Sequence, residues 1–438
     1  MSGLAVDVEV DRFAHDRQLL EVACQVTPMG AQTASKAPGR VGPIGAFPLF
    51  ARFGKGPYLY SGDDETPYVD WFNGNCAVTL GHSNPRINDR MKESIDRGTL
   101  LSLPTSIESR VAAELIDAIP CAEMVRFTKT GSEACAGAVR IARMATGRQV
   151  IAVVRGQYHG WHDWHCVTKV EHPGVPDWMA NGIRQFTYND LDSLREIMGA
   201  DVAAVMLEPT LAVAPALGFL EGVKQIAHAR GALLIFDEMI TGGRWHRGGA
   251  QAVYGVTPDL ATFGKAYANG APLAFIAGRR DLMQHAWTVS GTFGGETIGL
   301  SACLAVLDIL RSTHSIDRMH TVGRMLKASV NGTCEALRFP ARLVGPDVRP
   351  VWDWSAVSLA ERPLIQSLLQ QELAAAHVLV HLSGWNTSAA HDAVAMEKTV
   401  LGCEQALVHM SCYLNDPPEE RSKHLRGQMI HEGMVRPS

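Results

Sequence analysis

Three charged residues follow three short apolar segments of the chain, and together they could act on a bound ligand. Glu208 follows the apolar run 202–207, Asp237 follows 233–236, and Lys265 stands two residues after 260–263. In open α/β sheets, ligands bind just beyond the carboxyl ends of the strands. A single charge after a strand is commonly an ordinary loop residue. Two carboxylates and a lysine in equivalent places favour a binding site.

Lys265 has the surroundings expected of a nucleophilic amine. It lies between Phe263-Gly264 and Ala266-Tyr267, and partial desolvation by such neighbours favours the neutral amine that Schiff-base chemistry requires. The alternative is a surface lysine at a turn. A lysine of an ATP-type phosphate loop is excluded, because Asp259 stands where that pattern needs Gly and Ala266 where it needs Ser or Thr.

Asp237 requires a cationic partner, because an uncompensated anion at the end of a buried strand is costly. A protonated pyridine nitrogen of a cofactor would satisfy this requirement. A structural pair with Arg244 is the alternative. The presence of Lys265 after the next strand favours the cofactor.

The segment 130–133, Thr-Gly-Ser-Glu, precedes a predicted helix over 134–145. Backbone N–H groups at a helix start bind phosphate, and Gly131 lets a ligand approach closely. An ordinary serine cap at Ser132 is the alternative interpretation.

The segment 158–165 is dense in aromatic rings and imidazoles, beginning with Tyr158 and His159. Stacking of an aromatic ring on a planar ligand is the main hypothesis, and packing in a core or interface is the alternative. Zinc binding by the three histidines is a minority hypothesis, because no second set of matched ligands is evident. The sequence has no GxGxxG, GxSxG or HExxH pattern, which weakens dinucleotide-binding, serine-hydrolase and zincin hypotheses.

The elements that must position these residues form an alternating pattern. Short apolar runs over 150–154, 202–207, 233–236 and 260–263 are separated by helix-like segments such as 221–230, and this pattern predicts a mainly parallel sheet covered on both faces. A helix is expected over 11–26, hairpin strands over 58–60 and 68–72, and a long helix over 301–311. We expect an N-terminal segment (1–75) that contributes to the small domain and to a dimer, a large α/β domain (76–305) and a small C-terminal α+β domain (306–438).

Composition and charge narrow the class of protein. The 438 residues are 46% hydrophobic and 19% charged, which excludes a disordered, collagen-like or coiled-coil chain. The net charge of −5 gives no sign of nucleic-acid binding or of a polybasic membrane anchor. No apolar run is long enough to span a membrane. The low charged fraction suggests a surface covered by a partner subunit.

The cellular compartment is inferred from the N-terminus and the cysteines. Residues 1–9 are acidic and lack the basic and apolar regions of a secretory signal. Nine scattered cysteines without a CxxC pair indicate buried thiols in a reducing compartment. We expect a cytoplasmic protein.

The ordered motifs together resemble those of the class III aminotransferases, which are fold type I enzymes dependent on pyridoxal 5′-phosphate. The likeness covers roughly residues 45 to 310 and is closest to the glutamate-1-semialdehyde aminomutase-like branch. The motifs that carry it are 127–134 (FTKTGSEA), 158–160 (YHG), 208–209 (EP), 236–242 (FDEMITG), 254–260 (YGVTPDL), 263–265 (FGK) and 291–295 (GTFGG). The resemblance implies a large domain with a mainly parallel, seven-stranded-type sheet and a smaller α+β domain.

The resemblance also implies roles for individual residues. Lys265 would form the Schiff base with the cofactor and later move a proton. Asp237 would pair with the pyridinium nitrogen and keep the ring an electron sink. Tyr158 would stack on the ring, and Gly131 and Ser132 would hold the phosphate.

Three further residues complete the implied cofactor site. Glu208 would lie near the hydroxyl side of the ring or support substrate, and His159 would brace the cofactor environment. Thr292 would reach the phosphate of the neighbouring subunit, because this family builds its sites across a homodimer.

The resulting functional prediction is transamination from an amino-acid donor to a carbonyl acceptor through Lys265. Gly243 stands where an aromatic residue is usual, Val213 where the aminomutase has a polar residue, and Ser383 where it has an acidic one. These departures argue against glutamate-1-semialdehyde itself as the substrate. By analogy with this branch, a polar, bulky acceptor such as a keto sugar is expected. The alternatives are an intramolecular aminomutase, a racemase or epimerase with the same cofactor, and a non-catalytic relative.

Overall fold

The computed structural model describes residues 13–62, 66–169, 172–210 and 212–430. Contacts divide the chain into two compact units. Of the described residues, the large unit comprises those of Cys76–Thr321 and Gly345–Val348, and the small unit comprises those up to Asn75, Val322–Val344 and those from Arg349 to 430. Residues 1–9, on which the expectation about a secretory signal depends, lie outside the described residues.

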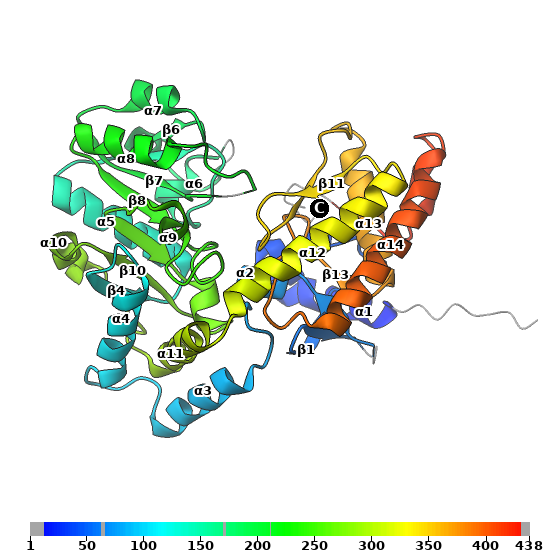
Figure 1. Ribbon diagram of the computed structural model, residues 1–438, viewed down its shortest axis with the longest axis horizontal. Coiled ribbons are helices and arrows are strands. Elements are labelled where there is room, and N and C mark those ends of the chain that lie inside the picture. Colours follow the sequence, from blue (N-terminus) through cyan, green and yellow to red (C-terminus); the bar gives the residue numbers. More distant parts are fainter. Residues whose placement is uncertain (1–12, 63–65, 170–171, 211, 431–438) are drawn as a thin grey trace, which may run out of the picture. The chain divides into compact units, whose positions relative to one another are not determined.

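The large unit contains a seven-stranded sheet in the order β4-β10-β9-β8-β7-β5-β6 (Figure 1). Four neighbouring pairs are parallel, whereas β10 is antiparallel to both β4 and β9. This arrangement confirms the predicted mainly parallel α/β fold. The strands are β4 (Met124–Thr128), β5 (Val150–Val154), β6 (Ile183–Phe186), β7 (Val202–Leu207), β8 (Leu233–Asp237), β9 (Leu260–Phe263) and β10 (Ala274–Gly278).

The central strands are apolar along their whole length because both faces of the sheet are covered. Every residue of β5, β7 and β9 is buried. A half-exposed strand would instead alternate apolar and polar residues. Helix α5 (Gly131–Thr146) packs against the sheet through alanine and small side chains, with Ala134, Ala138 and Ala142 fully buried.

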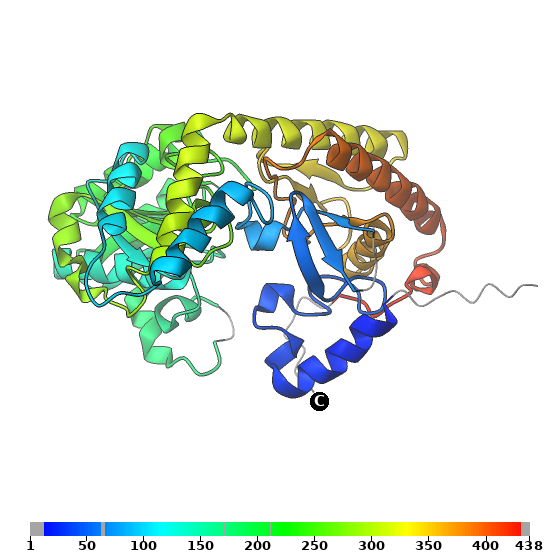
Figure 2. The same ribbon diagram turned by 90° about the horizontal axis from the view of Figure 1, so that it is seen from below.

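Local sequence signals begin and end the helices of the large unit. Asn84 accepts a hydrogen bond from the backbone of Arg86 at the start of α3 (Pro85–Arg97), and a Thr105–Glu108 capping box begins α4 (Ser106–Ala118). Helix α11 (Thr297–Ser312) lies against α3 and α4 (Figure 2). The other helices here are α6 (Asp163–Cys166), α7 (Leu191–Ile197), α8 (Phe219–Ala229), α9 (Ala250–Tyr254) and α10 (Arg280–Met283), with 3-10 turns η3 (Asp177–Gly182), η4 (Lys265–Ala268) and η5 (Gln284–Thr288).

The small unit joins segments that are distant in the sequence. Its four-stranded sheet has the order β1-β2-β3-β13, and β13 pairs in parallel with β3 through Val378 and Val69. Its elements are α1 (Ala14–Val26), η1 (Pro28–Gly30), η2 (Ala34–Lys36), β1 (Ala51–Lys55), β2 (Tyr58–Ser61), β3 (Tyr68–Asp70), β11 (Arg342–Val344), β12 (Val351–Asp353), α13 (Arg362–Ala375), β13 (Val378–Leu379), α14 (Ala393–Asn415) and η6 (Arg421–His424). A boundary between the two units falls within each of two further helices, α2 (Asn73–Cys76) and α12 (Ser315–Ala336).

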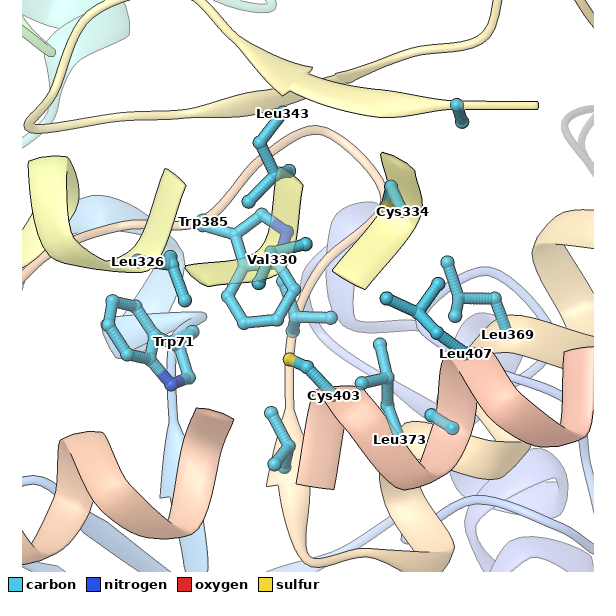
Figure 3. Packing of buried hydrophobic residues seen from close by; sticks show 14 of the residues in the cluster. Trp71, Leu326, Val330, Cys334, Leu343, Leu369, Leu373, Trp385, Cys403 and Leu407 are labelled. Atoms are coloured by element: carbon cyan, nitrogen blue, oxygen red, sulfur yellow. The ribbon is translucent and has the colours of Figure 1, made fainter. Parts of the chain in front are cut away.

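A tryptophan-rich core holds the small unit together (Figure 3). Trp71 and Trp385 are fully buried, with ring centroids 5.5 Å apart in an edge-to-face arrangement. Leu326 and Val330 of α12, Leu369 of α13 and Leu407 of α14 point toward the same cluster. Each such apolar side chain contributes about 1.5–3 kcal/mol when it is removed from water.

The compact units differ from the predicted domain limits in two stretches. The boundary between 75 and 76 coincides with a change of unit, but residues 306–321 and 345–348 lie in the large unit. The reason for the first stretch is that α11 is buried between other elements of the large unit, with Leu300, Cys303 and Val306 fully buried. The three domains as functional divisions stay a prediction.

Two observations concern the expectations about membrane spans and about cysteines. No helix in the described part of the chain combines the length and apolar character needed to cross a membrane. All nine cysteines are free. The cytoplasmic location itself stays a prediction.

Candidate active site

The three chemistry-bearing residues lie along one edge of the sheet. Strands β7, β8 and β9 are neighbours and run in parallel, so their carboxyl ends meet at the same edge. Glu208 directly follows β7, Asp237 is the last residue of β8, and Lys265 follows β9 after Gly264. Parallel pairing therefore converts three distant positions in the sequence into one site.

A cavity of about 310 Å³ opens at this edge. Glu208, Asp237 and Lys265 line it together with Gly131 and Ser132. Its other walls are Lys129, Cys135, Tyr158, His159, Gly160, Met239, Ile240, Ala271, Pro272 and Leu273. Seven of the eight residues predicted for the cofactor site thus share one cavity.

Lys265 is held in a strained backbone conformation. Its φ of 44° lies in the left-handed region, which residues with a side chain rarely adopt. It begins the turn η4, and Gly264 before it allows close packing, because a Cβ there would lie 2.8 Å from the sulfur of Met239. Strained residues of this kind cluster at functional sites, where surrounding structure fixes them.

Four groups donate hydrogen bonds to the carboxylate of Asp237. His159 Nδ1 lies 2.7 Å from Oδ2, and the thiol of Cys135 lies 3.5 Å from the same oxygen. The backbone N–H of Met239 lies 3.1 Å from Oδ1, and the hydroxyl of Thr262 lies 3.2 Å from it. The carboxylate is therefore fixed in orientation as well as buried.

These contacts keep Asp237 ionised. Burial by itself raises the pKa of a carboxyl group, but the hydrogen bond and charge of His159 outweigh it. The Met239 N–H and the charge of Lys265 act in the same direction, so the pKa of Asp237 lies below its ordinary value. A permanent anion is what a protonated ring nitrogen requires as its partner.

The N-terminus of α5 forms an anion cradle beside this carboxylate. Thr130 and Glu133 form a capping box, in which Glu133 Oε2 accepts from Thr130 N at 2.9 Å. The next backbone N–H groups, of Gly131 and Ser132, belong to the first turn and have no carbonyl to bond within the helix. A helix start with these groups directed at a cavity suits a phosphate.

Two glycines keep the cradle open. A Cβ on Gly131 would lie 2.9 Å from the sulfur of Met239, and one on Gly160 would lie 2.8 Å from the Cα of Ser132. Gly160 also has a φ of 106°, which only glycine adopts readily. The Trp161 N–H donates to Ser132 Oγ at 3.2 Å and holds the two segments together.

The aromatic and histidine-rich segment is divided between cavity and core. Tyr158 lines the cavity and is 57% exposed, which leaves its ring face available for stacking. His159 and His165 are buried with ring centroids 5.1 Å apart, and burial next to His159 lowers the pKa of His165 to about 4. Within the described residues, no group of three metal-ligating side chains could hold an ion.

Thr292 is the one predicted site residue that lies elsewhere. It is exposed and lines a separate cavity of about 230 Å³ with Phe127 and Arg140. Arg244, the alternative partner of Asp237, instead donates to the carbonyl of Cys76 at 2.6 Å.

Sequence reasoning missed several residues at the site. Cys135 and Thr262 bond Asp237, and Lys129 forms an ion pair with Glu296 at 2.5 Å on the cavity wall. Gln157 bonds the backbone of Glu208. The only available signal was proximity, because each is adjacent or nearly adjacent in sequence to a predicted site residue.

The donor set fits pyridoxal 5′-phosphate. An amine, a buried carboxylate, an aromatic face and a helix-start cradle all line one cavity. His159 is fully buried, and among the described residues its Nε2 has no hydrogen-bond partner while its Nδ1 holds Asp237. A planar, phosphorylated ring with a basic nitrogen and an aldehyde would satisfy the amine, the carboxylate, the aromatic face and the helix-start cradle.

Comparisons with known proteins agree with this geometry. The family model for class III aminotransferases matches residues 43–342. A protein named glutamate-1-semialdehyde 2,1-aminomutase from Natranaerobius thermophilus is 32% identical over 90% of this chain and 98% of its own length. One of the same name from Syntrophobacter fumaroxidans is 38% identical over 67% of this chain and 71% of its own.

A solved structure shows the same architecture. The FumI protein of Sphingopyxis sp. MTA144, in its pyridoxal phosphate internal aldimine form, superposes with a TM-score of 0.83 at 25% identity, covering 91% of this chain and 96% of that one. This likeness and the family match agree with the fold and the cavity described above. The chain therefore belongs to the class III aminotransferases and is a fold type I enzyme that uses pyridoxal 5′-phosphate.

Proposed function

We propose that this enzyme moves an amino group between neighbouring carbons of one amino aldehyde, as a glutamate-1-semialdehyde aminomutase does. The observation that carries the amino-transfer chemistry is the shared cavity of Lys265, Asp237 and the α5 N-terminus. Support for the intramolecular form comes from two relatives, which both bear the aminomutase name. This proposal favours the alternative raised by the sequence over donor-to-acceptor transamination.

The residues at the sheet edge would hold the cofactor in a defined orientation. The amine of Lys265 would bond its aldehyde carbon, and Asp237 would face its ring nitrogen. Gly131 and Ser132 would bind its phosphate through the first N–H groups of α5. Tyr158 would cover one ring face.

Bound in this way, pyridoxal phosphate supplies an electron sink for the carbon that bears the amino group. Lys265 would remove a proton from that carbon and return one to a neighbouring position. Asp237, ionised by the contacts of His159, would keep a positive charge on the ring nitrogen. Glu208 would support the ring hydroxyl or the substrate from the end of β7.

A homodimer with shared sites would explain the position of Thr292. The residue is exposed and lies outside the cavity that contains Lys265 in the same chain, as expected of a group serving a neighbouring subunit. The exposed apolar side chains of Leu101, Leu103 and Phe293 also favour a covered surface. The backbone of Thr99 accepts from Thr297 N at 2.9 Å, which links the two segments that carry these residues.

Transamination between separate molecules is the second candidate. It is favoured by the aminotransferase family match and by the departures at Gly243, Val213 and Ser383 from the aminomutase pattern. Val213 is 63% exposed, and neither Val213 nor Gly243 lines the cavity that contains Lys265, so neither narrows it. A keto sugar or similar polar carbonyl compound would be the acceptor.

A single assay separates the two candidates. The holoenzyme is mixed with glutamate-1-semialdehyde without any added acceptor or donor, and the product is followed with time. We expect multiple turnovers to 5-aminolevulinate, the product of an amino shift to the neighbouring carbon. Conversion limited to one turnover per cofactor, relieved only by a keto acid or keto sugar, would overturn the aminomutase proposal and support transamination.

A further inference from the structure

Gln157 bonds both backbone groups of Glu208. Its side-chain oxygen accepts from the Glu208 N–H at 2.8 Å, and its side-chain nitrogen donates to the Glu208 carbonyl at 3.2 Å. Gln157 is 6% exposed and Glu208 is 7% exposed. The side-chain amide of Gln157 therefore bonds the backbone of Glu208 in the way that a neighbouring strand would, and Glu208 lines the cavity.

The need for this contact arises where the sheet ends. Strands β5 and β7 pair in parallel up to Val153 and Met206, and β5 ends at Val154. Beyond this point the β5 chain turns away, while the β7 chain continues into Glu208. Gln157 therefore supplies the Glu208 N–H and carbonyl with hydrogen-bond partners at a point where the paired part of β5 has ended.

The residues after Glu208 are also held by side chains. The hydroxyl of Tyr188 donates to the Pro209 carbonyl at 2.9 Å, and the hydroxyl of Tyr254 lies 3.3 Å from Thr210 Oγ1. The segment 208–210 is therefore attached at successive residues to three different parts of the large unit. Of these three attachments, only that of Gln157 holds a residue that lines the cavity, namely Glu208.

The residues that follow Gln157 in the chain form another wall of the same cavity. Tyr158 and His159 follow it directly; Tyr158 lines the cavity and His159 bonds Asp237. A displacement of Gln157 relative to Glu208 would change the spacing between these two walls.

We infer that Gln157 is a positioning residue that fixes Glu208 relative to Tyr158 and His159, and so sets the alignment of the ring and substrate. The inference rests on the proposed function, because it assigns these walls to the bound cofactor. In this role Gln157 acts through its hydrogen bonds alone and requires no contact with the substrate.

The test compares two glutamine-to-methionine variants of the holoenzyme. Gln157→Met keeps the length and bulk of the side chain but removes both hydrogen bonds. Gln185→Met is the matched control, because Gln185 on β6 makes one 3.4 Å bond to the Thr168 carbonyl and does not line the cavity. The measurements are kcat and KM with glutamate-1-semialdehyde, and the absorption spectrum of the bound cofactor as a function of pH without substrate.

We expect Gln157→Met to lower kcat by about 10- to 100-fold and to change the pH titration of the cofactor spectrum, because small misplacements at a reacting centre have effects of this size. Gln185→Met should match wild type in both. Gln157→Glu, which keeps the acceptor for the Glu208 N–H and replaces the amide NH2 by a carboxyl oxygen, should also alter the spectrum and provides a second variant if the methionine protein does not fold.

A folded Gln157 variant with wild-type kcat and cofactor spectrum would overturn the inference. If the thermal midpoint of that variant also falls, the role of Gln157 is merely structural. Failure of the proposed function is distinguishable, because wild-type enzyme would then take up cofactor with a normal spectrum but not convert the amino aldehyde.

Discussion

At the scale of single residues, the site combines an amine and a carboxylate that are fixed in different ways. Lys265 stands on a strained turn between Gly264 and Ala266. Asp237 accepts four hydrogen bonds, which together with the charge of Lys265 keep it anionic. We propose that the first group is the reacting amine and the second the partner of the ring nitrogen.

Replacement of the lysine tests the first of these assignments. Lys265→Ala should lower turnover by at least about 10²- to 10⁴-fold, because the proton-transferring amine is lost. Borohydride reduction of the wild-type holoenzyme should attach the cofactor to the peptide containing Lys265, and the variant should show no such label. The control is Lys224→Ala, since Lys224 donates to the Thr257 carbonyl outside the cavity. Normal turnover by Lys265→Ala would refute the assignment.

At the scale of elements, the cavity is formed where loops at the sheet edge meet the start of a helix. The Lys129 ammonium connects several of these elements, because it pairs with Glu296 at 2.5 Å and donates to the Pro272 carbonyl at 3.3 Å. Glu296 also caps α11 by accepting from Ile298 N and Gly299 N at 2.8 Å. One ion pair thus links the turn before α5, the loop after η4 and the start of α11.

Removal of this cation should destabilise the protein more than removal of an exposed one. The side chains of Lys129 and Glu296 are only 16% and 12% exposed, so Lys129→Met leaves a largely buried carboxylate without its cation. We expect a loss of about 2 kcal/mol in the free energy of unfolding, measured by urea denaturation. In Lys92→Met, the exposed 3.7 Å pair with Asp89 is lost and the change should be below about 1 kcal/mol. Equal changes in the two variants would contradict the prediction.

At the scale of the whole molecule, two units are stabilised in different ways. The large unit is organised by its buried sheet, whereas the small unit combines an aromatic core with a buried charge. Glu372 on α13 accepts from Gln371 Nε2 at 2.9 Å, His409 Nδ1 at 2.8 Å and Arg426 at 2.9 Å. These contacts join α13, α14 and the C-terminal segment near Arg426.

This carboxylate predicts how stability depends on pH. Burial by itself raises the pKa of Glu372, but the hydrogen bonds of Gln371 and His409 and the charge of Arg426 lower it below its ordinary value. A carboxyl group whose pKa is lower in the folded than in the unfolded protein stabilises the folded state at pH values above its pKa in the unfolded protein. This contribution is lost as the pH falls through the pKa of the group in the folded protein. Glu372→Gln should therefore cost about 1–2 kcal/mol at pH 7, with a smaller difference below about pH 4.

Thermal unfolding midpoints of wild type and Glu372→Gln between pH 3 and pH 7 check this prediction. The two curves should converge toward acidic pH. A difference that does not change with pH would show that Glu372 acts through packing and not through its charge.

The sequence by itself determined the α/β fold class, four central strands and the candidate residues at their ends. Continuous apolar runs are unambiguous where both faces of a strand are buried, so 150–154, 202–207 and 260–263 coincide with β5, β7 and β9. Strands β4, β6 and β10 were not predicted. Strands β4 and β6 are only partly buried, so they lack a continuous apolar run, whereas β10 is fully buried but has only five residues that end in Gly278. The antiparallel direction of β10 has no local signal either.

Only the tertiary structure decided which groups meet at the site. The contacts of Asp237 with His159 and Cys135 join residues 78 and 102 positions apart, and those of Gln157 with Glu208 span 51 positions. Strand order fixes such pairs, and strand order depends on long-range packing that leaves no periodic trace in the chain. Local sequence specifies elements and their ends; the distances between side chains follow from how those ends are brought together.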